Sequence, residues 1–226
     1  MSSGRQGELV EASEPQGGDS PNIGMIILAA GASSRMGTPK QLLPYRGRSF
    51  LSHITEAAVA SVCHPVVVVL GANTEQLKPE VSQLPVQVVE NQHWVEGMSS
   101  SIRSGIEALN DMSQNLEAVA IALCDQPFVS SQIINHLVAA YRFTGKPIVA
   151  SQYAGTLGVP ALFSRAFFPE LTALGASEGA KHLIKKYSYK VSPVPFAEGA
   201  IDIDTPKDYQ QFQVMTGEEL TSLRGV

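Results

Sequence analysis

The glycines and bases between Leu28 and Pro44 form the stretch of this sequence with the clearest chemical use. The stretch reads LAAGASSRMGTPKQLLP and directly follows an apolar run. Glycine lets the backbone come close to a ligand, and successive N–H groups of such a loop can surround phosphate oxygens. Arg35 adds a planar fork of donors and Lys40 a mobile positive charge. The loop predicts a phosphate site; the alternative is an ordinary turn from strand to helix with solvated bases.

Carboxylates at two distant places could bind the metal ion that accompanies a polyphosphate. Asp125 directly follows an apolar run, and Asp202 and Asp204 lie two residues apart, on one face of an extended segment. Because Mg²⁺ commonly uses one or two carboxylates plus substrate phosphates, a sparse protein site suffices. Each place also has a simpler interpretation. Aspartate is common in turns, and Thr205 with Asp208 has the spacing of a helix capping box.

The segment from Asn91 to Ile102 is the third candidate. Its serines, Ser99 to Ser101, are expected in the first turn of a helix, where free N–H groups and the helix dipole favour an anion. Capping of that helix by one serine, with Trp94 as an apolar anchor, explains the same residues without a ligand. His93 has no partner motif, and we expect it to be solvated or structural rather than a catalytic base.

Short apolar runs alternate with helical patterns, and these elements must position the candidate residues. The runs expected to be strands are 25–30, 65–70, 86–89, 118–124, 147–150, 160–163 and 191–195. Helices are predicted at 49–62, 98–109, after Ser130, at 164–172, at 177–187 and from about Thr205. This alternation indicates an α/β fold, three-layered and Rossmann-like, whose mainly parallel sheet is covered by helices on both faces. Ligands then bind beyond the carboxyl ends of the strands, where the glycine-rich loop and Asp125 fall.

Composition favours one folded domain with a local anion site. The 226 residues are 44% hydrophobic and 16% charged, and we expect a flexible tail at 1–23 and a single domain at 24–226. The net charge of −5 argues against nucleic acid as a partner. Residues 20–55 differ from the rest, because they carry four bases and no acid, net +4. That distribution is typical of a local anion site rather than a broad basic face.

The two cysteines and the lack of long apolar runs predict a cellular compartment. Cys63 and Cys124 lie outside any C-x-x-C or Cys/His cluster, so neither structural zinc nor a disulfide framework is expected. Buried free thiols fit a reducing environment. The N-terminal residues lack the apolar core of a signal peptide, and no run approaches the roughly 20 apolar residues of a membrane span. We therefore expect a cytoplasmic protein without membrane contact.

The glycine-rich loop resembles the signature loop of nucleotidyltransferases that activate phosphorylated small molecules with a nucleoside triphosphate. Its L-A-A-G, R-M-G and P-K-Q-L-L elements are most similar to the molybdenum cofactor cytidylyltransferases, and the resemblance covers residues 24 to about 213. It implies that loop backbone contacts the nucleotide while two bases hold the triphosphate. The residues that it assigns to the nucleotide are Leu28, Ala29, Ala30, Gly31, Arg35, Lys40, Asn91, Gly97 and Ser101.

The same resemblance assigns the metal ion and the catalytic residues. It makes Asp125, in D-Q-P, a ligand of Mg²⁺, and Asp204, in D-I-D-T-P, the second ligand. The choice between Asp202 and Asp204 stays open. Catalysis is assigned to Lys40, Arg35 and Asp125, which neutralise the triphosphate and hold the metal.

The part of the chain that the resemblance assigns to the acceptor departs from the family pattern. Val159 stands where a histidine is usual, and Ala176-Ser177 replaces Gly-Asp. Lys181 stands in place of arginine, and Glu178 is the candidate replacement for the missing carboxylate. The nucleotide half therefore matches the family better than the acceptor half.

The resemblance implies transfer of a nucleoside monophosphate, CMP from CTP, to a phosphorylated acceptor with release of pyrophosphate. Molybdopterin is the expected acceptor, Mg²⁺ the expected cofactor, and a protein partner in cofactor delivery a further expectation. One alternative is another acceptor, such as a sugar phosphate or an alcohol phosphate. Another is a non-catalytic nucleotide-binding regulator on the same fold. A Rossmann oxidoreductase is disfavoured because the sequence lacks G-x-G-x-x-G after its first strand.

Overall fold

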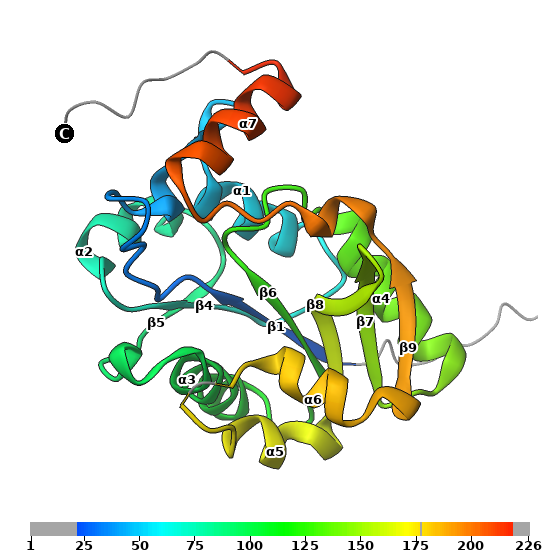
Figure 1. Ribbon diagram of the computed structural model, residues 1–226. Helices are drawn as coiled ribbons and strands as arrows, with labels where there is room; N and C mark the ends of the chain where they lie inside the picture. The colour runs from blue at the N-terminus through cyan, green and yellow to red at the C-terminus, as the bar shows by residue number, and fades with distance from the viewer. Residues whose placement is uncertain (1–21, 177, 219–226) are drawn as a thin grey trace, which may run out of the picture.

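A seven-stranded sheet forms the centre of the computed structural model, which describes residues 22–176 and 178–218 (Figure 1). The strand order is β5-β4-β1-β6-β8-β7-β9. Strand β8 runs antiparallel to both neighbours, and the other adjacent pairs are parallel. The strands are β1 (Ile23–Leu28), β4 (Val66–Leu70), β5 (Gln87–Glu90), β6 (Ala118–Leu123), β7 (Ile148–Tyr153), β8 (Thr156–Ser164) and β9 (Val191–Pro195). The predicted α/β fold with a mainly parallel sheet is confirmed.

Helices cover both faces of the sheet, as its apolar strands require. One face carries α1 (Phe50–Val59), α4 (Ser131–Thr144) and α7 (Pro206–Thr216), and the other carries α3 (Met98–Met112), α5 (Phe168–Thr172) and α6 (Ala180–Lys186) (Figure 1). Successive residues of β1 face opposite sides, so Met25 and Ile27 pack into one core and Ile26 and Leu28 into the other. The predicted three layers are therefore present.

Capping residues fix two helix starts where the sequence predicts them. Ser130 accepts the N–H of Ile133 at the start of α4, and Thr205 forms a capping box with Asp208 at the start of α7. The capping interpretation of Asp208 is thus confirmed, and it leaves Asp202 and Asp204 available for other contacts.

Elements too short to show a hydrophobic period were not predicted. They comprise a two-stranded hairpin, β2 (Pro44–Tyr45) and β3 (Arg48–Ser49), and the short helix α2 (Thr74–Leu77). Single 3₁₀ turns complete the chain: η1 (Lys40–Leu42), η2 (Lys78–Val81), η3 (Trp94–Glu96), η4 (Arg165–Phe167), η5 (Ser188–Lys190) and η6 (Ala197–Ala200).

The first strand begins slightly before the predicted domain boundary. Ile23 is buried and begins β1, one residue earlier than the expected domain start. Residues 1–21, on which the tail prediction mainly falls, lie outside the described residues. Among the helices of the described residues, none combines the length and the apolar character that crossing a membrane requires.

Candidate active site

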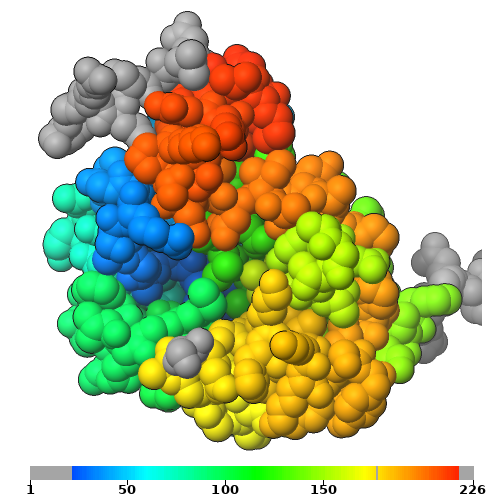
Figure 2. Space-filling model, viewed as in Figure 1, coloured from blue at the N-terminus to red at the C-terminus, as the bar shows by residue number. Residues whose placement is uncertain are grey.

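A cavity of about 330 Å³ opens at the carboxyl ends of β1 and β6, where this fold class binds its ligands. Figure 2 shows the depression where the blue N-terminal loop meets the green segments of the chain. The wall contains most residues that the sequence assigns to the nucleotide: Leu28, Ala29, Ala30, Gly31, Lys40, Gly97 and Ser101. Asp125 joins them from the end of β6. Residues that are distant in the sequence thus share one cavity.

A buried glutamine holds the glycine-rich loop in shape. Gln41 Nε2 donates to the carbonyl oxygens of Ala29 and Gly31, at 2.9 and 2.8 Å. Ser33 Oγ donates to Gln41 Oε1 at 3.1 Å and accepts the N–H of Lys40 at 3.0 Å. No role for Gln41 is predicted from the sequence, although a polar side chain directly before the apolar pair Leu42-Leu43 is a usable signal.

Lys40 lies at the centre of a charged cluster on the cavity wall. Its Nζ is 2.5 Å from Asp125 Oδ2 and 2.9 Å from Asp204 Oδ1. Burial disfavours the charge of Lys40, but Asp125 and Asp204 outweigh burial and raise the pKa of its ammonium. Arg35, which is exposed and lies outside the main cavity, contacts Asp204 Oδ2 at 2.7 Å. The predicted bases and carboxylates therefore contact one another in the folded chain, although Lys40 and Asp204 are 164 residues apart in the sequence.

Three carboxylates converge beside Lys40. Asp125, Asp202 and Asp204 each offer an oxygen within 4.8 Å of the others. The backbone N–H of Ile203 donates to the carbonyl oxygen of Asp125 at 3.2 Å and ties the two segments together. Although Asp202 is exposed as a residue, desolvation of its carboxyl group and the negative charge of Asp125 raise its pKa to about 7.

The donor set at this cluster fits a divalent cation. Asp125 Oδ1 is buried and has no hydrogen-bond partner among the described residues. Such an orphaned oxygen is costly unless something compensates it. Hard oxygen ligands are the ones that Mg²⁺ and related cations prefer, and all three groups here are carboxylates. Asp202 therefore joins the predicted pair of Asp125 and Asp204 as a third candidate ligand.

Asn91, in the segment before α3, is predicted to contact the nucleotide but does not lie on the cavity wall. Asn91 is buried, and its Nδ2 donates to the hydroxyls of Ser100 and Ser101 at 2.8 and 3.0 Å. These hydrogen bonds hold the first turn of α3. Ser101 lines the cavity, whereas Asn91 does not. Gly97 precedes α3 with a φ of 108°, a conformation that glycine adopts readily.

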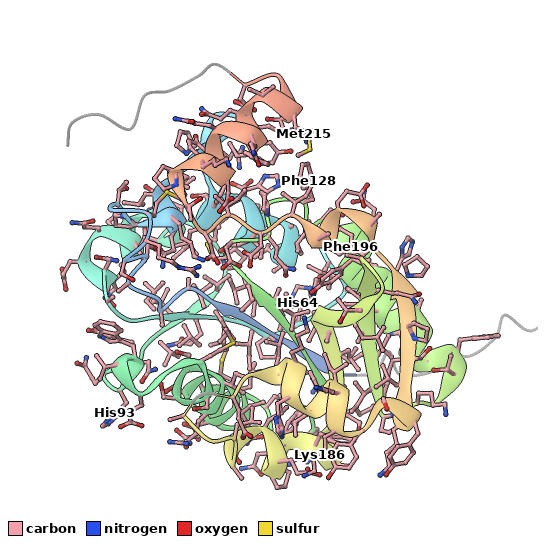
Figure 3. The ribbon with its side chains drawn as sticks, viewed as in Figure 1. His64, His93, Phe128, Lys186, Phe196 and Met215 are labelled. Atoms are coloured by element: carbon pink, nitrogen blue, oxygen red, sulfur yellow. The ribbon has the colours of Figure 1, made fainter. Side chains whose placement is uncertain are left out.

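The remaining bases of the positive stretch and His93 lie away from the cluster. Arg46 stacks over the ring of Tyr45, 5.0 Å from its centroid, and Arg48 pairs with Glu56. They support the β2–β3 hairpin and leave Arg35 and Lys40 to form the local positive site. His93 lies at the outer edge of the molecule, away from its centre (Figure 3), in agreement with the prediction that it is solvated.

The residues that the resemblance assigns to the acceptor make different contacts. Glu178 Oε2 accepts the N–H of Gly175 at 2.8 Å, and Glu178 Oε1 lies 3.3 Å from His182 Nδ1. Its carboxylate therefore stabilises its own loop instead of reaching the cavity. A β carbon on Gly97 would lie 2.1 Å from the carbonyl oxygen of Ala176, so this loop packs directly on the start of α3.

The combination of a glycine-rich loop, a central lysine and a carboxylate cluster at the carboxyl edge of a mainly parallel sheet defines the class of protein. It is an α/β protein of the nucleotidyltransferase fold. The chain belongs to the MobA-like NTP transferase domain family, which it matches over residues 25–191. The resemblance seen in the sequence is thereby confirmed at the level of the family.

Proteins similar to the chain include two curated relatives and one of known structure. The "Purine catabolism protein PucB" of Bacillus subtilis is 30% identical over 84% of this chain and 95% of its own length. The "Nicotine blue oxidoreductase" of Paenarthrobacter nicotinovorans is 37% identical over 55% of this chain. That alignment spans 59% of the relative, less than two thirds of its length.

The solved structure is that of Rv0371c from Mycobacterium tuberculosis. It is 29% identical, covers 85% of this chain and 98% of its own, and superposes with a TM-score of 0.73. A further structure of Rv0371c is a complex with manganese; it is 26% identical over 84% of this chain and 97% of its own, with a TM-score of 0.66.

Proposed function

We propose that this protein is a metal-dependent cytidylyltransferase that transfers CMP from CTP to a phosphorylated acceptor, with molybdopterin as the best candidate. An acceptor phosphate oxygen attacks the α-phosphorus of the triphosphate. The new bond joins that oxygen to the α-phosphorus, and the bond to the β-phosphate oxygen breaks, so that pyrophosphate leaves. The observation that supports this best is Lys40, which lies between Asp125 and Asp204 on the wall of the cavity.

The chain's own residues act by positioning and by charge. Lys40 and Arg35 neutralise the triphosphate, and the backbone around Ala29, Ala30 and Gly31 orients it, because these groups line or adjoin the cavity. The second pKa of a phosphate monoester is about 6, so the acceptor is already largely dianionic at neutral pH. The reaction then needs no general base, which agrees with the absence of a histidine from the residues lining the cavity.

The metal in this proposal is Mg²⁺, held by Asp125 and Asp204 with Asp202 beside them. When bound, a divalent cation neutralises charge on the phosphates. The orphaned Asp125 Oδ1 and the three converging carboxylates support a divalent cation of this kind. The manganese complex of Rv0371c adds support from a relative.

The identity of donor and acceptor rests on the resemblance of the loop to the cytidylyltransferase branch. We propose that Leu28, Gly97 and Ser101 contact the nucleotide, since they line the cavity, and that Asn91 acts indirectly through the serines it bonds. A sugar phosphate or an alcohol phosphate is the alternative acceptor. The reaction is proposed to occur in the cytoplasm, with delivery of the product to a protein partner.

Pyrophosphate release tests this proposal. The full chain is incubated with each of the four ribonucleoside triphosphates, with Mg²⁺, and with a panel of phosphorylated acceptors that includes molybdopterin. We expect release with CTP and molybdopterin, and none without Mg²⁺. A preference for GTP contradicts the cytidylyl assignment. Tight CTP binding without turnover for any acceptor supports the regulator instead.

A further inference from the structure

Each of the two central charged residues is followed in the chain by a buried glutamine. Gln41 follows Lys40, and Gln126 follows Asp125. The two glutamines are only 1% and 4% exposed, although a buried amide is costly unless it is hydrogen-bonded. In both, the side-chain nitrogen donates to two carbonyl oxygens from other parts of the chain. The proposed function gives neither glutamine a role.

Gln41 acts on the glycine-rich loop. Its Nε2 joins the carbonyl oxygens of Ala29 and Gly31, and its Oε1 accepts from Ser33. A carbonyl oxygen that accepts such a bond is not free to face a phosphate, which it would repel. Because Ser33 also accepts the N–H of Lys40, the same network fixes the backbone of the lysine. The side-chain hydrogen bonds of Gln41 therefore all go to the glycine-rich loop, on the proposed phosphate side of the site.

Gln126 acts on the carboxylate side. Its Nε2 donates to the carbonyl oxygens of Val159 and Gly199, at 3.1 and 3.2 Å. Gly199 belongs to η6, which ends directly before the segment that carries Asp202 and Asp204. Val159 belongs to β8. Gln126 therefore ties the end of β6, where Asp125 stands, to that segment.

We propose that Gln41 and Gln126 are positioning residues with separate targets. Gln41 holds the loop in the shape that receives a triphosphate, and Gln126 holds residues 199–204 so that their carboxylates meet Asp125. The assignment of Gln41 to a triphosphate and of Gln126 to a metal ion rests on the proposed function. The two sets of hydrogen bonds that these glutamines donate, which we call the clamps, do not depend on it.

Hydrogen exchange of the unliganded full chain tests the clamps without reference to activity. The variants are Gln41→Leu and Gln126→Leu, with Gln114→Leu as control, because Gln114 is exposed and precedes β6 at the other end of the sheet. In Gln41→Leu, amides of residues 29–40 should exchange at least tenfold faster and those of 199–204 within twofold of wild type. Gln126→Leu should show the reverse, and Gln114→Leu should change neither segment.

Ligand binding provides a second readout. If the glutamines had only a general structural role, each variant would weaken the binding of CTP and of Mn²⁺ alike. The affinity for CTP is measured by calorimetry in EDTA, and the affinity for Mn²⁺ alone by electron paramagnetic resonance. Gln41→Leu should raise the Kd for CTP about tenfold, equivalent to ~1.4 kcal/mol, and change that for Mn²⁺ less than twofold. Gln126→Leu should raise the Kd for Mn²⁺ about tenfold and change that for CTP less than twofold.

The outcomes separate failure of the clamps from failure of the proposed function. Unchanged exchange, or equal acceleration of both segments in both variants, overturns the proposal. If wild type binds none of the four triphosphates when Mg²⁺ is present, the proposed function fails, while the exchange pattern still decides the clamps. If a leucine variant does not fold, Gln→Glu at the same position removes the two donor bonds with the same shape and is judged by the same readouts.

Discussion

The proposed nucleotide half and the proposed acceptor half of the site are built in different ways. Most of the nucleotide half is one continuous loop after β1, closed on itself by Gln41, with Lys40 at its end, and the start of α3 adds Gly97 and Ser101. The acceptor half combines Val159 of β8 with the loop before α6, and the segment after η6 with the proposed metal ligands comes from a third place in the chain. A continuous loop can be recognised from local sequence, whereas an assembled surface depends on which segments the fold brings together.

Three contacts join the nucleotide half to these other segments of the chain. Asp125 joins Asp204 through Lys40, Ile203 bonds the carbonyl of Asp125, and Gly97 packs on the carbonyl of Ala176. Asp125, Asp204 and Gly97 match the resembling family, but Ala176 and Ser177 do not. The difference suggests that chemistry at the junction is kept while the acceptor loop is free to change.

The largest effect is expected at the junction itself. Asp125→Ala should lower kcat at least about 100-fold, because it removes the buried carboxylate that pairs with Lys40 and is proposed to hold the metal. The measurement is pyrophosphate release at saturating CTP and Mg²⁺, with Asp111→Ala, an exposed site on α3, as the control. A variant that keeps near-normal turnover would refute the metal role of Asp125.

Lys40→Ala should have the next largest effect. We expect kcat/KM for CTP to fall about 30- to 100-fold, because the triphosphate loses a positive charge and Asp125 and Asp204 are left without their common partner. Lys185→Ala, exposed on α6, is the matched control. If the Asp125 and Lys40 variants retain CTP affinity and turnover alike, the nucleotide half does not do the chemistry assigned to it.

Gly97→Ala tests the contact between the halves. The new β carbon would lie 2.1 Å from Ala176 O at a φ of 108°, so unfolding free energy in urea should fall by about 1–3 kcal/mol. Gly31→Ala is the comparison, because nothing lies within 4 Å of its added carbon; its stability change should stay within about 0.5 kcal/mol. Equal losses in both variants would mean that the packing of the two halves does not depend on Gly97.

The smallest effect is expected in the acceptor half. Glu178→Gln should change kcat/KM for the acceptor less than twofold, because this carboxylate faces Gly175 and His182 instead of the cavity. The acceptor dependence of turnover measures it. A tenfold rise in acceptor KM would instead give Glu178 the role of the carboxylate that the family has at the neighbouring position.

Local signals predicted much of the fold and the nucleotide half. The apolar runs gave the seven strands to within a few residues, and Ser130 and Thr205 gave helix starts, because hydrophobic period and capping are encoded nearby. The β2–β3 hairpin and α2 were missed because they are too short to show a period. The choice between Asp202 and Asp204 stayed open, and the clamp of Gln126 was missed, because both depend on contacts between distant segments.

The position of the transferred phosphorus is the most direct test of the central claim. CTP labelled with ³²P at the α or the γ position is incubated with the full chain, Mg²⁺ and molybdopterin, and the products are separated. We expect the α label to move to the acceptor product and the γ label to leave in pyrophosphate. Transfer of the γ label, or retention of both labels in CTP under conditions where CTP binds, would contradict it.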